Sequence, residues 1–167
     1  MTGLFPPDLH HFNAAQGWLE LGNAGEASRE LERVSAENQS HPDVLELRWE
    51  LLALEKRWAE AADVADKLVR VAPARCSGWI HRSYALHELG RTREAWDKLL
   101  PAATDFPKVS TVPYNLACYA CQLGHLDEAR EWLATARRAG DAKHITEMAR
   151  KDRDLEALWG EMGGCEA

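Results

Sequence analysis

Apolar and polar positions along this chain follow the spacing of amphipathic helices, and the pattern returns every 34 residues. Within one period, two apolar helical runs are separated by Leu89-Gly90-Arg91, whose glycine can end the first helix in a left-handed conformation. The recurrence is clearest in four alanines that each follow a glutamate: Ala27, Ala61, Ala95 and Ala129. The pattern predicts stacked units, each made of a helix A, a tight turn and a helix B.

Other columns of the sequence keep the same period. One apolar column contains Trp18, Leu52, Leu86 and Ala120, and the turn column contains Gly22, Lys56, Gly90 and Gly124. A small alanine after each turn allows the two helices of a unit to approach closely, because a larger side chain would push them apart. Few residues favour strands, so the predicted fold class is all-α.

These residues resemble the tetratricopeptide repeat (TPR). The third unit matches at Trp79, Leu86, Gly90, Ala95, Ala102 and Pro107, and the fourth at Leu116, Ala117, Gly124, Ala129 and Ala136. The first two units depart from the motif, since Lys56 replaces the turn glycine and bulky Trp49 stands where a small residue is usual. The resemblance implies a right-handed α-solenoid of four TPR helix-turn-helix repeats, at about 8–41, 42–75, 76–109 and 110–140.

The two ends of the array need covering, because a solenoid exposes core residues at its termini. After Gly140 the period stops, and apolar residues at helical spacing in 142–149 and 153–162 predict helices that cover the fourth repeat. We expect residues 141–167 to form these C-terminal capping helices and a frayed tail, within a single domain overall. At the other end, Asp8 is placed to cap the first helix.

Composition and charge narrow the function. The chain has 20 basic and 27 acidic residues and a net charge of −7, and its basic residues are mixed with acidic ones. No basic stripe of the kind that follows a phosphate backbone is visible, so nucleic acid is not an expected partner. The sequence also shows neither a transmembrane segment nor a secretion signal, so we expect no membrane partner and a cytoplasmic location.

Candidate chemistry is sparse. Cys118 and Cys121 form a Cys-x-x-Cys pair without the second ligand pair that zinc sites of this type carry, and small core or groove residues are the better interpretation. The histidines do not gather in sequence, and no nucleophile motif or glycine-rich phosphate loop appears. We therefore expect no metal, no cofactor and no enzyme activity.

In TPR arrays the A helices line the concave surface, and the resemblance assigns ligand contacts to that groove. The expected groove residues are Phe12, Gln16, Glu46, Glu50, His81, Tyr84, His87, Tyr114, Asn115 and Cys118. Their mixed character suits an extended or helical peptide with apolar anchors and a Lys or Arg. Packing between repeats is an equally good interpretation for apolar members such as Phe12. The lysine, asparagine and arginine clamp that binds chaperone C-termini in some TPR proteins has no counterpart here.

Three functions fit this sequence. The preferred one is a stand-alone TPR adaptor or scaffold, similar to small bacterial repeat proteins, that binds a protein or peptide partner in its groove. The alternative is a dedicated chaperone similar to the small TPR chaperones of type III secretion, although those generally carry three repeats and a longer N-terminal helix. A purely structural role through self-association is the weakest. The identity of the partner does not follow from the sequence.

Overall fold

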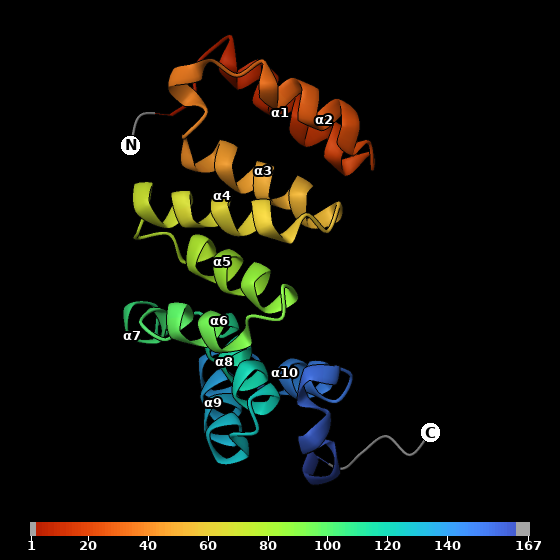
Figure 1. The fold of residues 1–167 in the computed structure, drawn as a ribbon, viewed down its shortest axis with the longest axis vertical. Helices are drawn as coiled ribbons and strands as arrows, with labels where there is room; N and C mark the ends of the chain where they lie inside the picture. Colours follow the sequence, from red (N-terminus) through yellow and green to blue (C-terminus); the bar gives the residue numbers. More distant parts are fainter. Residues whose placement is uncertain (1–2, 163–167) are drawn as a thin grey trace. The chain divides into compact units, whose positions relative to one another are not determined.

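The computed structural model describes residues 3–162, and this part of the chain is helical, with no strand (Figure 1). Residues 1–2 and 163–167, the latter being the expected frayed tail, lie outside the described residues. The chain divides into two compact units, residues 1–85 and 86–167, and the boundary falls within one helix, α5. Each unit is considered by itself below.

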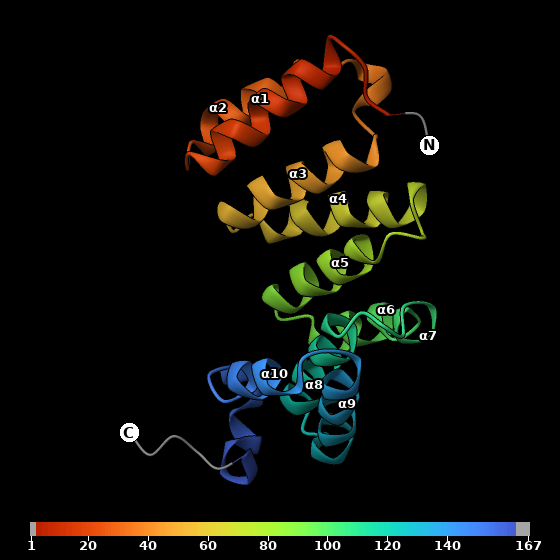
Figure 2. The ribbon, with the colours of Figure 1, turned by 180° about the vertical axis from the view of Figure 1, so that it is seen from behind.

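Unit 1 is built from two helical hairpins and most of a fifth helix. Its elements are α1 (Asp8–Glu20), α2 (Ala24–Glu32), the 3₁₀ helix η1 (Ala36–Asn38), α3 (Pro42–Leu54), α4 (Trp58–Val71) and α5 (Cys76–Glu88). The helices of each hairpin, α1 with α2 and α3 with α4, lie side by side in both views (Figures 1 and 2). Each hairpin thus pairs a helix A with a helix B, as the repeat pattern predicts.

Unit 2 continues the repeat and then departs from it. Its elements are α6 (Thr92–Leu99), α7 (Ala102–Asp105), α8 (Thr111–Gln122), α9 (Leu126–Ala139), α10 (Ala142–Ala149) and the 3₁₀ helix η2 (Arg153–Met162). The B helix of the third repeat is divided into α6 and α7 at Leu100-Pro101, because proline has no amide hydrogen and its ring obstructs the preceding turn. Helices α8 and α9 form the hairpin of the fourth repeat.

The four A–B turns have one backbone geometry. Gly22, Gly90 and Gly124 have φ of 75°, 74° and 79°, and Lys56 has φ of 55° at the same repeat position. After each, an amide donates to a carbonyl five residues back, as Arg57 does to Leu52 at 2.9 Å. This pattern is the Schellman end of a helix, which requires a left-handed residue. The second repeat therefore keeps the turn although it has lost the glycine.

The alanine column is fully buried, as the close approach of paired helices predicts. All four repeat alanines have 0% exposed surface: Ala27, Ala61, Ala95 and Ala129. A comparable close approach brings α5 onto α4, where a Cβ added to Gly78 would lie 3.1 Å from Leu68 and 3.2 Å from Val69. Small residues thus set the helix spacing wherever two backbones come together.

The expectation for Asp8 is wrong in its detail. The cap position of α1 is Pro7, and Asp8 makes no capping bond because it is the first residue of the helix. Its carboxylate instead accepts hydrogen bonds from the amide of Ser35 at 2.8 Å and from the side chain of Asn38 at 2.6 Å. The bond from Asn38, followed by those from Ser35, lowers the pKa of Asp8. Asp8 thereby ties the start of α1 to the end of the first hairpin.

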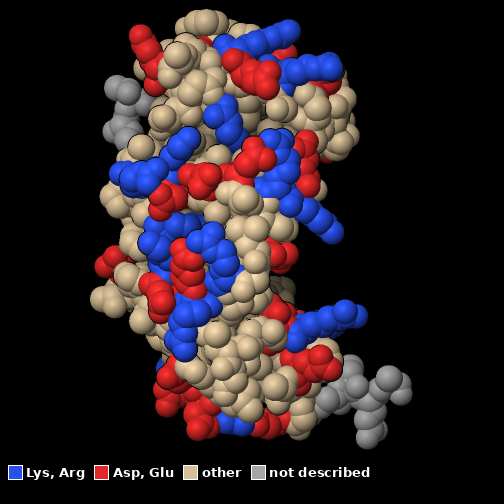
Figure 3. All heavy atoms as spheres, viewed as in Figure 1, with Lys and Arg blue, Asp and Glu red and all other residues tan. Residues whose placement is uncertain are grey.

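Charges of both signs are intermixed on the face seen in Figure 3, where acidic and basic side chains alternate over the helices. Many are neighbours one helical turn apart, such as Arg57 with Glu60 at 2.6 Å and Arg91 with Glu94 at 2.6 Å. Such exposed pairs contribute little to stability. Across residues 3–162, none of the helices combines the length and apolar character needed to span a membrane.

Candidate functional site

Unit 1 carries a group of aromatic and acidic side chains on its A helices α3 and α5 and at the start of the B helix α4. We define the aromatic–acidic face as Glu46, Trp49 and Glu50 of α3, Trp58 at the start of α4, and His81 and Tyr84 of α5. Residues three and four apart on a helix share one side, which places each helix's members together. Ring contacts join side chains of α3, α4 and α5, so these residues are neighbours in space and not only in the sequence pattern.

The rings hold one another in place. Trp49 and His81 are stacked, with centroids 3.9 Å apart and planes 5° from parallel. Tyr84 meets Trp49 edge-on at 6.3 Å and Trp58 edge-on at 5.7 Å. Each such pair adds about 0.5–1.5 kcal/mol beyond the area that it buries. Tyr84 nevertheless remains 40% exposed, so a rigidly held ring faces solvent.

The two carboxylates of this face differ in their hydrogen bonds and ion pairs. Glu46 accepts a hydrogen bond from Ser77 and forms an ion pair with Arg75 at 3.2 Å. Arg75 is shared, because it also pairs with Asp43 at 2.5 Å. Glu50 has no ion pair or hydrogen bond to any side chain within residues 3–162. Partial burial raises the pKa of Glu50, and the negative charge of Glu46 raises it further.

His81 adds a ring but no charge. Burial lowers the pKa of His81 to about 4, although Glu46 acts in the opposite direction. The imidazole is therefore neutral at neutral pH and stacks on Trp49 as an uncharged plate. Its Nδ1 and the Nε1 of Trp49 are buried without a hydrogen-bond partner in the described part of the chain. The face thus combines apolar rings with excess negative charge.

The corresponding face of α8 in unit 2 is covered by the chain itself. We call residues 152–162 the 152–162 segment. Its Asp152 accepts hydrogen bonds from the hydroxyl of Tyr114 at 2.8 Å and from the thiol of Cys118 at 3.6 Å. Tyr114 is 7% exposed and Cys118 is 4% exposed. Burial, together with the neighbouring carboxylates, raises the pKa of both groups, so both stay protonated.

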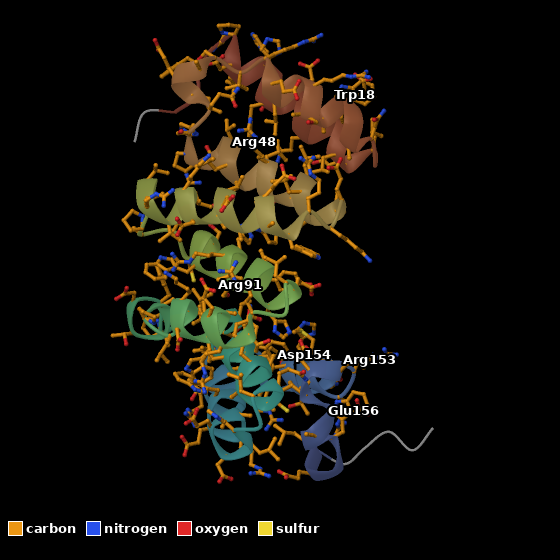
Figure 4. The ribbon with its side chains drawn as sticks, viewed as in Figure 1. Trp18, Arg48, Arg91, Arg153, Asp154 and Glu156 are labelled. Atoms are coloured by element: carbon orange, nitrogen blue, oxygen red, sulfur yellow. The ribbon has the colours of Figure 1, made fainter. Side chains whose placement is uncertain are left out.

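Further bonds hold the segment on α8 and on the end of α5. His87 Nε2 lies 3.0 Å from a carboxylate oxygen of Asp154, and the side chain of Gln122 donates to the Asp154 carbonyl at 3.0 Å. Figure 4 marks Asp154 next to α8 and shows Arg153 extending away from α8. Leu155 and Leu158 are buried at 0% and 2% exposure. The segment therefore combines buried apolar side chains with hydrogen bonds to its neighbours.

One cluster has the residue types of a metal site. The side-chain ligand atoms of Cys118, Asp152 and Asp154 lie within 4.8 Å of one another. Each already has a partner inside the protein, since the thiol donates to Asp152 and His87 contacts Asp154. Asp152 also accepts the amide of Asp154 at 3.1 Å, which closes the segment's own turn. Hydrogen bonds from Tyr114 and Cys118 of α8 and from His87 of α5 hold the two carboxylates of this cluster.

The remaining expected groove residues lie in several environments. Phe12 packs against the apolar core of unit 1, in line with its packing interpretation, whereas Gln16 is exposed on α1. Asn115 is half-buried on α8. The structure thus brings Glu46, Glu50, His81 and Tyr84 together in unit 1. It places His87, Tyr114 and Cys118 together beneath the 152–162 segment.

Sequence reasoning missed several members of these two sites. Trp49 stands out in the sequence only as a bulky departure from the motif, and that departure is the available signal for an aromatic site. Trp58 carries no distinguishing signal, because abundant tryptophan most often means packing. Asp152 and Asp154 lie where the repeat has ended, so the period could not align them with Tyr114 or His87.

A separate cavity lies among α2, α3 and α4. Its volume is about 400 Å³, and its lining mixes basic Arg48, Arg57 and Lys67 with acidic Glu32 and Asp63. Arg48, labelled in Figure 4, donates a hydrogen bond to Gln39, and burial lowers its pKa. Because both charge signs face this cavity, it favours no particular ligand.

The chain resembles known proteins at the level of structure. No protein-family model and no curated protein matches the sequence. MamA 41-end from Desulfovibrio magneticus RS-1 is 18% identical with a TM-score of 0.74, covering 96% of this chain and 93% of that one. TTC0263, a thermophilic TPR protein of Thermus thermophilus, is 20% identical with a TM-score of 0.73, covering 93% and 83%.

A third similar structure is YrrB, a TPR protein with an unusual peptide-binding site. It is 13% identical with a TM-score of 0.69, and the match covers 93% of this chain and 78% of YrrB. Identities this low carry information about fold and not about ligands. These structural similarities, together with the 34-residue period, the repeated Schellman turns and the buried alanine column, show that this chain has the all-α helical solenoid fold of the TPR proteins.

Proposed function

We propose that this chain is a protein-interaction scaffold or adaptor that holds a peptide, or a helical segment of a partner, on its A-helix surface. The observation that carries the proposal is the aromatic–acidic face, where Tyr84 is fixed between two tryptophans yet is 40% exposed. Aromatic side chains with few rotatable bonds are typical anchors at interfaces. Because the rings are already ordered, a partner loses little conformational entropy of the receptor on binding.

The proposed contacts are Gln16, Glu46, Glu50, His81 and Tyr84. The other expected groove residues are less accessible. Phe12 packs in the core of unit 1, and Tyr114 and Cys118 are covered by the 152–162 segment. His87, Tyr114 and Cys118 would contact a partner only after that segment had moved, and Asn115 is half-buried on the same α8. Unit 1 is therefore the part of the chain in which we place the primary contact.

Likeness to the TPR proteins supports this function by fold alone. TPR proteins present successive A helices to their ligands, and YrrB is one TPR protein with a peptide-binding site. The aromatic–acidic face lies on such A helices, α3 and α5. No residue of this face forms a nucleophile–base pair, so binding without catalysis is the proposal that its chemistry supports.

Selection from a random peptide library on the purified protein tests the proposal. Selected peptides should lose at least about tenfold in affinity when Tyr84→Ala removes the exposed anchor. Phe5→Ala removes another exposed aromatic ring of unit 1 and serves as the matched control, with no change expected. Peptides that bind both variants like the wild type would contradict a site on this face.

A second experiment separates adaptor from chaperone. Copurification from the native host should recover a larger assembly if the chain is an adaptor. Recovery of a single secreted client, stabilised by the chain, would favour the chaperone alternative instead. Loss of the same partner with Tyr84→Ala would place either function on the aromatic–acidic face.

A further inference from the structure

We infer that the aromatic–acidic face of unit 1 recognises a basic side chain of its partner, with the guanidinium of an arginine as the preferred group. This inference rests on the proposed function, because it specifies the chemistry of the peptide that the face would bind. It is carried by three observations: an excess of carboxylates, one carboxylate without a cationic partner on the helix that also carries Trp49, and an arginine bound by a ring and a carboxylate elsewhere in the same unit.

The first observation is the balance of charge. Asp43, Glu46 and Glu50 contribute three carboxylates, and Arg75 is the cation that pairs with the first two. His81 does not add to the positive side, because burial lowers its pKa to about 4. Arg48, the basic residue of this stretch of α3, lines the separate cavity and donates to Gln39. The side of α3 that carries Glu46 and Glu50 therefore keeps an excess of negative charge at neutral pH. A cationic group from a partner would balance it, whereas an acidic peptide would be repelled.

The second observation is the position of Glu50. It lies one helical turn beyond Glu46 and next to Trp49 in sequence, and α5 places His81 on that same indole. Glu50 has no cationic partner within residues 3–162, and Glu46 repels its charge. A carboxylate in partly desolvated surroundings attracts a cation more strongly than one in open water. A guanidinium entering here would pair with Glu50 and lie over a ring.

The third observation is an arginine that unit 1 already binds in this way. The guanidinium carbon of Arg82 lies 5.1 Å from the centroid of the Trp79 ring, and its Nη1 is 3.1 Å from an oxygen of Asp66. That site combines an indole face with a carboxylate, and it holds the guanidinium in a buried position. The aromatic–acidic face offers the same two components, a ring and a carboxylate, and within residues 3–162 no arginine pairs with its Glu50.

Arginine suits the face better than lysine. Its planar guanidinium stacks on aromatic rings and is less strongly hydrated than an ammonium group. It can also donate two parallel hydrogen bonds to one carboxylate, which fits Glu50 because that carboxylate has no other ion-pair partner in the described chain. Lysine would keep the charge attraction but lose the stacking and the paired hydrogen bonds.

The test uses the whole chain and peptides selected from a random library. Arginine should be enriched at one position, and its replacement by citrulline, a neutral isostere, should weaken binding at least about tenfold in calorimetry. Replacement by lysine should weaken binding less. Glu50→Lys should reduce affinity for the arginine peptide, and a peptide with glutamate at that position should bind this variant better than the wild type. The affinity of Glu50→Gln for the arginine peptide should lie between those of the wild type and Glu50→Lys, because this substitution removes the charge and preserves the shape.

The control is Glu37→Lys, which makes the same change of charge at an exposed position of η1. Its affinity should match the wild type, and circular dichroism should show unchanged helix content in every variant. Peptides that require Tyr84 but show no arginine preference, and are indifferent to Glu50→Lys, would overturn this inference and leave the proposed function standing. If no selected peptide depends on Tyr84, the proposed function itself fails.

Discussion

The same repeat position has opposite environments in the two units. Glu50 of α3 and Cys118 of α8 lie two periods apart in sequence, and both sit on the exposed side of a helix A in the repeat pattern. Glu50 faces solvent, whereas Cys118 is 4% exposed beneath Asp152. The repeat therefore determines which side of a helix a residue occupies. It does not determine whether that side stays free.

The difference follows from what each face can bind. On α8 the column residues Tyr114 and Cys118 both donate hydrogen bonds, and the acidic 152–162 segment supplies the acceptor at Asp152. On α3 the same columns hold Glu46 and Glu50, which would repel such a segment. Each face thus favours its own occupant: an acidic segment of the chain itself on α8, and the proposed basic peptide on α3.

The largest expected effect comes from Leu155→Ala on the covered face. Leu155 is fully buried, so truncation should lower the free energy of unfolding by about 2–5 kcal/mol. Glu156→Ala, at an exposed neighbour, should change it little. Urea unfolding followed by circular dichroism measures both. Equal stability of the two variants would mean that the segment is not held as part of unit 2.

Asp152→Asn should have the next largest effect. An amide accepts fewer hydrogen bonds than the carboxylate that now serves Tyr114, Cys118 and the segment's own backbone. The expected cost is about 1–3 kcal/mol, with faster labelling of the Cys118 thiol by an alkylating reagent. Asp105→Asn, on an exposed side chain of α7, is the control. Unchanged stability and unchanged labelling would contradict the role of Asp152.

Substitutions in the A–B turns of the two units should change stability by a smaller amount. Lys56 holds a left-handed conformation that costs a non-glycine residue about 1–2 kcal/mol, so Lys56→Gly should stabilise unit 1 by up to that amount. Gly90→Ala should destabilise the chain by a similar amount. A Cβ at Gly90 would meet nothing within 4 Å, so conformation alone is tested there. A stabilising Gly90→Ala would refute this account of the turns.

The smallest expected effect is a pH dependence of binding to unit 1. The pKa of Glu50 is raised, and only the ionised carboxylate attracts a cation, so affinity for an arginine peptide should fall as pH falls through that pKa. His81, with a pKa of about 4, remains neutral from about pH 7 to 5 and cannot cause the change. Calorimetry at a series of pH values should show the affinity decreasing toward acid pH. A Glu50→Gln variant that keeps the full pH dependence would assign it to another group.

The structural features that the sequence predicted correctly are those that recur with the repeat. The alanine column and the turn glycines predicted the helix pairs, because close helix packing and left-handed turns restrict which residues can occur there. Stepping along helix faces also selected Glu46, Glu50, His81 and Tyr84, and their role in binding stays a prediction. The prediction for Asp8 was wrong because capping is a local rule, and its actual partners, Ser35 and Asn38, are distant in sequence.

By itself, the sequence determined the helical hairpins and the side of each helix that a residue occupies, since local spacing and backbone sterics decide both. Only the tertiary structure decided which of those sides are covered. The stacking of Trp49 on His81 and the seating of Asp152 on Tyr114 and Cys118 join residues 32 to 38 positions apart. Contacts at that range depend on how helices pack and on charge complementarity between faces, and no periodic pattern records either.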